Sequence, residues 1–199
     1  MKIVSGLFLV LAMMVASQGV AAQVATHKYD IKSGIVTLES VSKVGTMEIK
    51  LKYVMYFDDY GMKECKETYK DGKLVNVFFS DGKTLYALNL GKKTASKKGD
   101  ASRGTEPRVE FSEMGSQKDR DSGKVRKISP MLVAGKQCEA IETNDGSGTV
   151  TQYAGWKKIM LYMKSRSAST ATTIKATKIE ENVAVPVAKF QVPAGYAIK

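Results

Sequence analysis

The sequence has little of the residues on which most enzyme active sites are built. It contains one histidine, His27, with only two cysteines and four prolines among 199 residues. A catalytic serine or thiol needs a base beside it, and His27 stands close to the N-terminus. No His, Cys, Asp or Glu residues occur at metal-ligand spacing, and no glycine-rich loop leads into a helix as a phosphate cradle requires. The sequence therefore predicts no catalytic residues, no metal, no cofactor and no enzymatic activity.

Long apolar runs are also scarce, and the one that stands out lies at the N-terminus. Residues 3–16 are mostly apolar, follow Lys2, and precede the small residues Val20-Ala21-Ala22. The run is too short to span a bilayer comfortably, and the whole pattern is typical of a secretory signal peptide. An uncleaved anchor or a buried first helix is the alternative, but a flank of charge is missing. We expect cleavage after Ala22, which leaves residues 23–199 as a single domain in the periplasm.

Acidic residues are outnumbered, with 20 Asp and Glu against 31 Lys and Arg and a formal net charge of +11. The hydrophobic content of 43% is that of a globular protein and excludes a disordered chain. Residues 91–104 have no apolar period, which predicts a mobile loop. This loop carries the basic residues Lys92, Lys93, Lys97, Lys98 and Arg103. It is either a solvated loop or a site for an anionic partner. Nucleic acid is not the expected partner, because no aromatic residues are interleaved with the lysines.

The two cysteines, Cys65 and Cys138, permit one intramolecular disulfide. An exported protein folds in an oxidising compartment, where such a pair can close. Each cysteine lies in a strand-like segment, residues 63–69 and residues 136–143. The bond therefore requires these two segments to be neighbours. Two buried free thiols are the alternative.

Apolar and polar residues alternate most clearly over residues 47–57, which predicts a long, half-buried strand. Residues 29–43 precede a turn at Gly45 and should pair with that strand as a hairpin. Three shorter strands follow at residues 63–69, 73–80 and 83–90. Asp71-Gly72 and Asp81-Gly82 separate them, and such pairs favour tight hairpins. Together these signals predict a consecutive antiparallel sheet.

The second half of the chain carries further strand candidates at residues 135–142, 149–155, 156–164 and 165–177. Between the two sets, residues 105–115 predict one or two turns of helix after Pro107.

The C-terminal third resembles a known family. Gly135-Lys136-Gln137-Cys138, Trp156-Lys157-Lys158-Ile159 and the ending KFQVPAGY look like exported bacterial proteins of the outer-membrane lipoprotein carrier (LolA-like) superfamily. The resemblance implies a mostly β fold, in which a strongly curved antiparallel sheet forms an incomplete barrel covered by short helices or loops. It also implies an apolar concave side, on which carriers of this kind hold acyl chains.

The alternating stripe supplies the expected lining of such a cavity. The candidates are Met47, Ile49, Leu51, Tyr53, Met55 and Phe57, with Ile159, Leu161 and Met163 from a later strand. Flexible methionines suit an adaptable apolar pocket, although the same stripe would also fit a closed core.

The sequence thus predicts a non-catalytic periplasmic binding or carrier protein. Its expected partner is a hydrophobic or acylated ligand, such as an envelope lipid or a lipoprotein. The alternative is a basic cell-envelope protein that binds an anionic surface polymer, lipopolysaccharide or a membrane face through residues 91–104.

Overall fold

The computed structural model describes residues 27–101 and 104–199, so the predicted signal peptide, residues 1–22, lies outside the described part of the chain. Twelve strands form one sheet in the order β12-β6-β5-β4-β3-β2-β1-β11-β10-β9-β8-β7. The strands are β1 (Gly34–Val44), β2 (Met47–Asp58), β3 (Lys63–Lys70), β4 (Lys73–Ser80), β5 (Thr84–Asn89), β6 (Thr94–Asp100), β7 (Val125–Val133), β8 (Lys136–Asn144), β9 (Val150–Trp156), β10 (Ile159–Arg166), β11 (Thr170–Glu181) and β12 (Ala197–Ile198). The helical segments are η1 (Asp59–Gly61), η3 (Phe111–Glu113), α1 (Gln117–Asp121) and η4 (Val187–Phe190).

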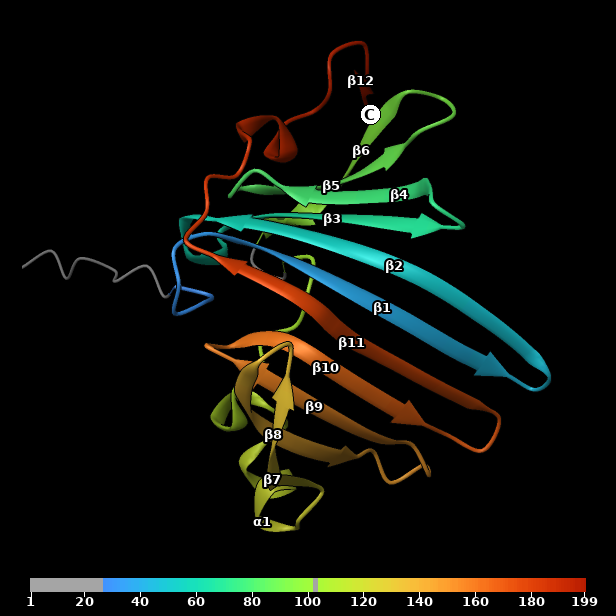
Figure 1. The fold of residues 1–199 in the computed structure, drawn as a ribbon, viewed down its shortest axis with the longest axis vertical. Helices are drawn as coiled ribbons and strands as arrows, with labels where there is room; N and C mark the ends of the chain where they lie inside the picture. The colour runs from blue at the N-terminus through green and yellow to red at the C-terminus, as the bar shows by residue number, and fades with distance from the viewer. Residues whose placement is uncertain (1–26, 102–103) are drawn as a thin grey trace, which may run out of the picture.

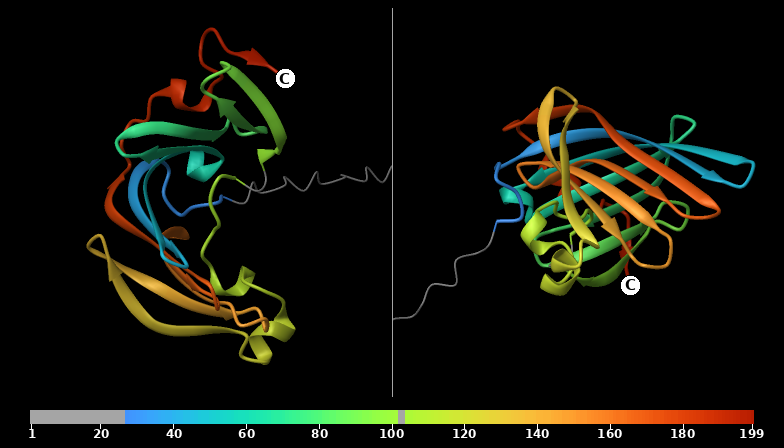
Figure 2. Two further views of the ribbon diagram at one scale, coloured as in Figure 1. Left: turned by 90° about the vertical axis from the view of Figure 1, so that its right-hand side faces the viewer. Right: turned by 90° about the horizontal axis from the view of Figure 1, so that it is seen from below.

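The sheet is strongly curved and remains open (Figure 1). In the side view of Figure 2 the strands bend around residues 104–124, which lie on the concave side together with the first described residues. Every strand pair is antiparallel except β12 with β6. In the described residues, β7 and β12 end the strand order and do not pair with each other. The predicted fold class is confirmed, with the short parallel strand β12 as the one departure from an antiparallel sheet.

The hairpins form where the sequence predicts them. At the turn between β3 and β4, Asp71 and Gly72 both have positive φ, 51° and 75°. Two consecutive residues with positive φ make the tight turn whose twist matches that of paired strands. The observed β3 and β4 therefore lie within a residue of the predicted strands at 63–69 and 73–80.

Residues 91–104 are not the mobile loop that the sequence predicts. Residues 94–100 form β6, which pairs with β5, so Lys97 and Lys98 stand on a strand. Lys92 and Lys93 form the turn before it, and Arg103 lies outside the described residues. The prediction failed because β6 lies near the edge of the sheet and needs few apolar residues, and lysines are common on such strands. Its apolar anchor is the fully buried Ala95.

The largest buried cluster fills the concave side at one end of the sheet. Tyr29, from the segment before β1, packs edge-on against Phe57 of β2, with their ring centroids 5.1 Å apart. Gly34 of β1 pairs with Phe57, and a Cβ at Gly34 would lie 2.6 Å from the Phe57 ring. A side chain at Gly34 would therefore push the ring out of this core.

The C-terminal segment covers the opposite, outer face. Neighbouring residues on β3 point to opposite faces of a sheet, and Glu64 contacts Tyr29 on the concave side while Cys65 packs with Phe190 of η4. Phe79 and Tyr86 complete this second cluster as stacked rings 4.9 Å apart. Figure 2 shows the C-terminal segment on the outside of the curve.

The predicted disulfide between Cys65 and Cys138 is wrong. Both cysteines are buried and free, and they belong to different core clusters. Cys65 lies on β3 and Cys138 on β8, with β2, β1, β11, β10 and β9 between them in the sheet. The two strands are not neighbours, so the condition for the bond is not met.

Candidate ligand-binding face

The apolar stripe of β2 changes from open to closed along its length. Met47 is 63% exposed and Ile49 39%, whereas Met55 is 2% exposed and Phe57 fully buried. Leu51 and Tyr53 lie between these extremes and are half-buried. The two sequence interpretations, cavity lining and closed core, therefore each describe one half of the same strand.

The closed half contains four of the predicted lining residues. Met55, Phe57, Ile159 and Leu161 all belong to the large buried cluster around Tyr29. Met163 is half-buried and packs against a third cluster that includes Ile141 and Met160. These residues hold the fold together and leave no room for a ligand between them.

The open half leads into a pocket of about 480 Å³ on the concave face. Leu51 and Tyr53 of β2 line it together with Lys66, Thr68, Asn76, Phe78, Leu85, Gly104 and Thr105. The volume falls within the range of small-molecule sites, roughly 300–1,000 Å³. Farther along the same face, Ile174 pairs with Ser40, which pairs with Leu51, so a further apolar side chain borders the open surface.

The pocket contains one positively charged side chain, that of Lys66. The Nζ of Lys66 lies 4.4 Å from the centre of the Tyr53 ring, and the same ammonium forms an ion pair with Glu106. The Lys66 side chain is 23% exposed. An ammonium over an aromatic ring is attracted to the negative face of the ring. The pocket is thus apolar on β2, carries both Asn76 and Phe78 on β4, and has one positively charged wall on β3.

A buried carboxylate lies beside the closed half, on β3 opposite Phe57. Glu64 is fully buried and accepts hydrogen bonds from Lys28 Nζ at 2.6 Å, from the Tyr29 hydroxyl at 2.5 Å, and from the Thr105 backbone nitrogen at 2.5 Å. Burial, followed by the nearby Glu64 charge, raises the pKa of Tyr29 well above its usual value. Glu64 therefore ties the segment before β1 and the chain after β6 to the concave face.

Glycine is required at this junction. Gly104 has φ +57°, and a Cβ there would clash with Lys28 Nζ and lie 2.5 Å from Glu64 Oε2. Another residue at position 104 would separate the ion pair. This site escaped sequence analysis because its members are far apart in the chain and follow no motif.

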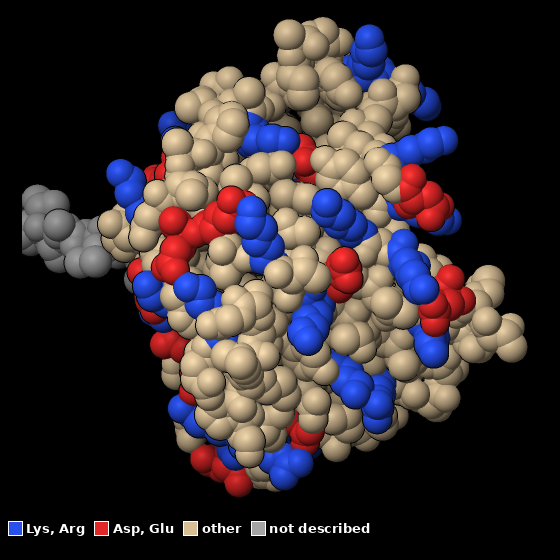
Figure 3. All heavy atoms as spheres, in the orientation of Figure 1, with Lys and Arg blue, Asp and Glu red and all other residues tan. Residues whose placement is uncertain are grey.

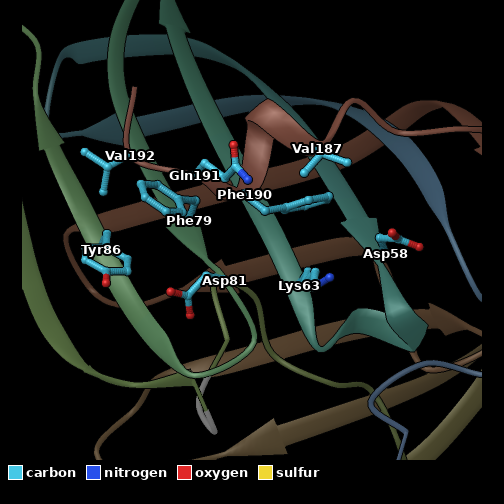
Figure 4. A pocket seen from close by; sticks show the side chains of 9 residues that line it. All are labelled: Asp58, Lys63, Phe79, Asp81, Tyr86, Val187, Phe190, Gln191 and Val192. Atoms are coloured by element: carbon cyan, nitrogen blue, oxygen red, sulfur yellow. The ribbon is translucent and has the colours of Figure 1, made fainter. Parts of the chain in front are cut away.

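A pocket of about 670 Å³ lies on the outer face beside Val54 and Tyr56. The C-terminal segment lines two smaller pockets of this face, which the sequence did not suggest. Figure 4 shows one of about 350 Å³, in which Phe79 and Tyr86 of the sheet approach Phe190 of η4, with Lys63 and Asp81 at its rim. The other measures about 290 Å³ and lies under residues 186–196. Burial raises the pKa of the Cys65 thiol in its wall to about 12. The C-terminal segment partly fills both hollows.

Few side chains among the described residues are arranged for catalysis or metal binding. His27 is exposed and stacks on Tyr60, with ring centroids 3.9 Å apart. Within residues 27–101 and 104–199, no three His, Cys, Asp or Glu side chains are grouped to hold a metal ion. Among the helices of this part of the chain, none has the length and hydropathy to cross a membrane.

No protein-family model and no curated protein matches this sequence. Solved structures share its architecture at low sequence identity. An uncharacterised conserved protein from Thermus thermophilus is 8% identical, with 84% of this chain and 90% of that chain covered and a TM-score of 0.55. A LolA superfamily protein from Nitrosomonas europaea is 8% identical over 83% and 92% of the two chains, with a TM-score of 0.46. Lipoprotein LppX from Mycobacterium tuberculosis is 12% identical over 79% and 91%, with a TM-score of 0.42.

The chain shares its fold with the Thermus thermophilus protein, at a TM-score of 0.55. The predicted architecture is confirmed, because the sheet is open and strongly curved and its apolar concave side is partly covered. At 8–12% identity the likeness concerns the fold alone, because one fold supports many functions.

Proposed function

We propose that this protein is a non-catalytic periplasmic binding or carrier protein that holds an acyl chain or a similar apolar ligand on the open half of its concave face. Residues 1–22 act as the signal peptide and are removed on export. The ligand is an envelope lipid or the acyl group of a lipoprotein.

The observation that carries the proposal is the exposure of apolar side chains on the concave side, where a closed fold would bury them. Met47 and Ile49 are exposed and Leu51 and Tyr53 half-buried, although all four share the face that forms the core farther along β2. Exposed apolar surface of this kind, continuous with a pocket, is typical of a binding site. A methionine at the entrance suits ligands of different shape, because its side chain is flexible.

The pocket favours binding over chemistry. Its polar side chains are Thr68, Asn76, Thr105 and Lys66, and the ammonium of Lys66 is paired with Glu106. No carboxylate pair or activated nucleophile lines it, so nothing in the described pocket suits acid–base or covalent catalysis. Lys66 is placed to meet the anionic end of a ligand whose chain lies along Leu51 and Tyr53.

Binding is tested with a matched pair of variants on β2. Leu51→Glu places a carboxylate in the concave pocket, whereas Val54→Glu places one at a half-buried position of the same strand that lines a pocket of the outer face. Titration with a fluorescent fatty acid should show at least tenfold weaker binding for Leu51→Glu and little change for Val54→Glu. Equal affinities in all three proteins, or no binding by the wild type, would contradict the proposal.

The identity of the natural ligand is tested by native mass spectrometry of protein purified from its own periplasm. We expect a co-purifying lipid mass that the Leu51→Glu variant loses. If the wild-type protein is repeatedly purified without any additional mass, that result would contradict stable lipid transport.

A further inference from the structure

Three hairpin turns lie together at one end of the sheet. They connect β1 to β2, β3 to β4, and β5 to β6. In consecutive antiparallel strands alternate turns share an end, and Figure 1 shows these three on the right-hand side. We call residues 43–50, 70–75 and 89–94 the turn rim. The open half of the concave face ends at this rim, because Met47 belongs to both.

The turn rim concentrates exposed apolar side chains. Nine large hydrophobic residues are exposed in the described part of the chain, and five of them are at the rim. These five are Val44, Met47, Ile49, Leu74 and Val75. They come from two separate turns of the rim. Clustered exposed apolar residues mark interaction surfaces.

The rim is also basic. Six exposed lysines lie in it: Lys43, Lys50, Lys70, Lys73, Lys92 and Lys93. The acidic residues of the rim are Glu48, whose carboxylate is 3.6 Å from Lys43 Nζ and 3.1 Å from Lys50 Nζ, and Asp71. Two other turns lie at this end, residues 144–150 and 166–170. Together they carry one acidic residue, Asp145, and one basic residue, Arg166. Lysine and arginine side chains are visible along the right-hand edge in Figure 3, with acidic side chains and uncharged surface between them.

We propose that the turn rim is the surface with which this protein docks on an anionic lipid bilayer. Lysines on a protein surface are attracted to anionic headgroups, and apolar side chains between them enter the boundary of the acyl region. The inference rests on the proposed function, since the rim is the open end of the ligand-binding face. A docked protein would present Met47 and Ile49 to the bilayer and Leu51 just beyond them, so that an acyl chain passes into the pocket without crossing bulk water.

A lipid surface fits the rim better than a protein partner does. The exposed apolar side chains stand on separate turns with lysines between them and do not line one groove. A fluid bilayer adapts to such separate contacts, whereas a protein partner needs a continuous complementary surface.

The test is sedimentation of the mature protein with vesicles. We expect binding to vesicles of equal parts phosphatidylglycerol and phosphatidylcholine, little binding to pure phosphatidylcholine, and weaker binding at 0.5 M salt because charges are screened. The double variant Val44→Ser/Val75→Ser should reduce the bound fraction severalfold. Leu132→Ser is its control, since Leu132 is 70% exposed but lies at the β7–β8 turn on the other end of the sheet.

A second pair of variants tests the charges. Lys92→Gln/Lys93→Gln should weaken vesicle binding severalfold, whereas Lys32→Gln/Lys157→Gln, which removes two lysines at the opposite end, should behave as the wild type. No binding to anionic vesicles at low salt, or equal losses in rim and control variants, would overturn the inference. Binding to a protein but to no vesicle would overturn it as well.

The outcome separates this inference from the proposed function. Leu51→Glu should lose the fluorescent fatty acid yet still sediment with anionic vesicles. Val44→Ser/Val75→Ser should bind the fluorescent fatty acid as the wild type does but sediment less with anionic vesicles. Loss of vesicle binding by the wild type with fatty acid binding intact would refute only the docking surface.

Discussion

Replacing Met55 with glutamate should lower the free energy of unfolding by several kcal/mol, whereas the same replacement at Leu51 should not. Met55 is 2% exposed, so the substitution removes a buried apolar side chain, which contributes about 1.5–3 kcal/mol. The new carboxyl also lacks a partner, which costs roughly 1–3 kcal/mol more. The loss of about 3–6 kcal/mol is a large part of a typical stability of roughly 5–15 kcal/mol.

The surroundings of Met55 offer the new carboxyl no relief. Lys66 is opposite Met55 on β3, but its ammonium is already paired with Glu106. The Tyr29 hydroxyl, 4.0 Å from Met55 Sδ, already donates to Glu64. A second carboxylate would therefore face the Glu64 charge in a buried site. At the half-buried Leu51 the carboxylate can reach water in the empty pocket, so a cost of about 1 kcal/mol or less is expected.

Urea unfolding followed by Trp156 fluorescence measures both variants. Burial and the nearby charge should raise the pKa of the introduced carboxyl above its unfolded value of about 4.3. The destabilisation of Met55→Glu should therefore be smallest below that value and grow as the pH rises through the folded pKa. A Met55→Glu protein within 1 kcal/mol of the wild type at pH 7 would mean that this half of the face is hydrated, and the division into open and closed halves would be wrong.

Three further predictions concern other parts of the chain. Glu64→Ala removes the acceptor of four hydrogen bonds and should destabilise the protein by about 3–5 kcal/mol, with faster hydrogen exchange in the covering segments; unchanged exchange there would show that they are held otherwise. Cys65 and Cys138 should resist iodoacetamide at pH 8 in the folded protein and react without prior reduction once it is unfolded, because both are buried and the pKa of Cys65 is about 12. A peptide map that contains a linked pair would contradict this. The mature protein should begin at Gln23 and fractionate with periplasmic contents, and an intact mass that retains residues 1–22 in a membrane fraction would refute the signal-peptide prediction.

Local sequence signals predicted the strands well wherever side-chain alternation or turn residues were strong. The stripe from residue 47 to 57 became β2, and the two Asp-Gly pairs stand at the turns on either side of β4. The strand β6 was missed, because its pairing with β5 uses backbone hydrogen bonds that leave no apolar period in the sequence. Helix α1 was missed too, although Ser116 and Asp119 form a capping box at its start.

What the sequence did not contain was the order of strands that are far apart in the chain. The failed disulfide and the undetected Glu64 junction have this same cause. Cys138 and Cys65 both lie on strands, as predicted, but β1 pairs with β11 and thereby places five strands between them. The alternation on β2 could not reveal where the covering segments stop, so it could not divide the stripe into its buried and open parts.

The pairing of β1 with β11 has a consequence for how this protein reaches its native state. Gly34 is opposite Glu181 and Val44 is opposite Thr170, so the centre of the sheet joins the two ends of the described chain. Bringing such distant segments together costs loop entropy before any contact compensates for it, and proteins dominated by distant contacts fold slowly. The central seam cannot close until nearly the whole polypeptide is available. A chain that emerges from its N-terminus can therefore form the hairpins from β1 to β6 early, but it can complete its sheet only after β11 has emerged.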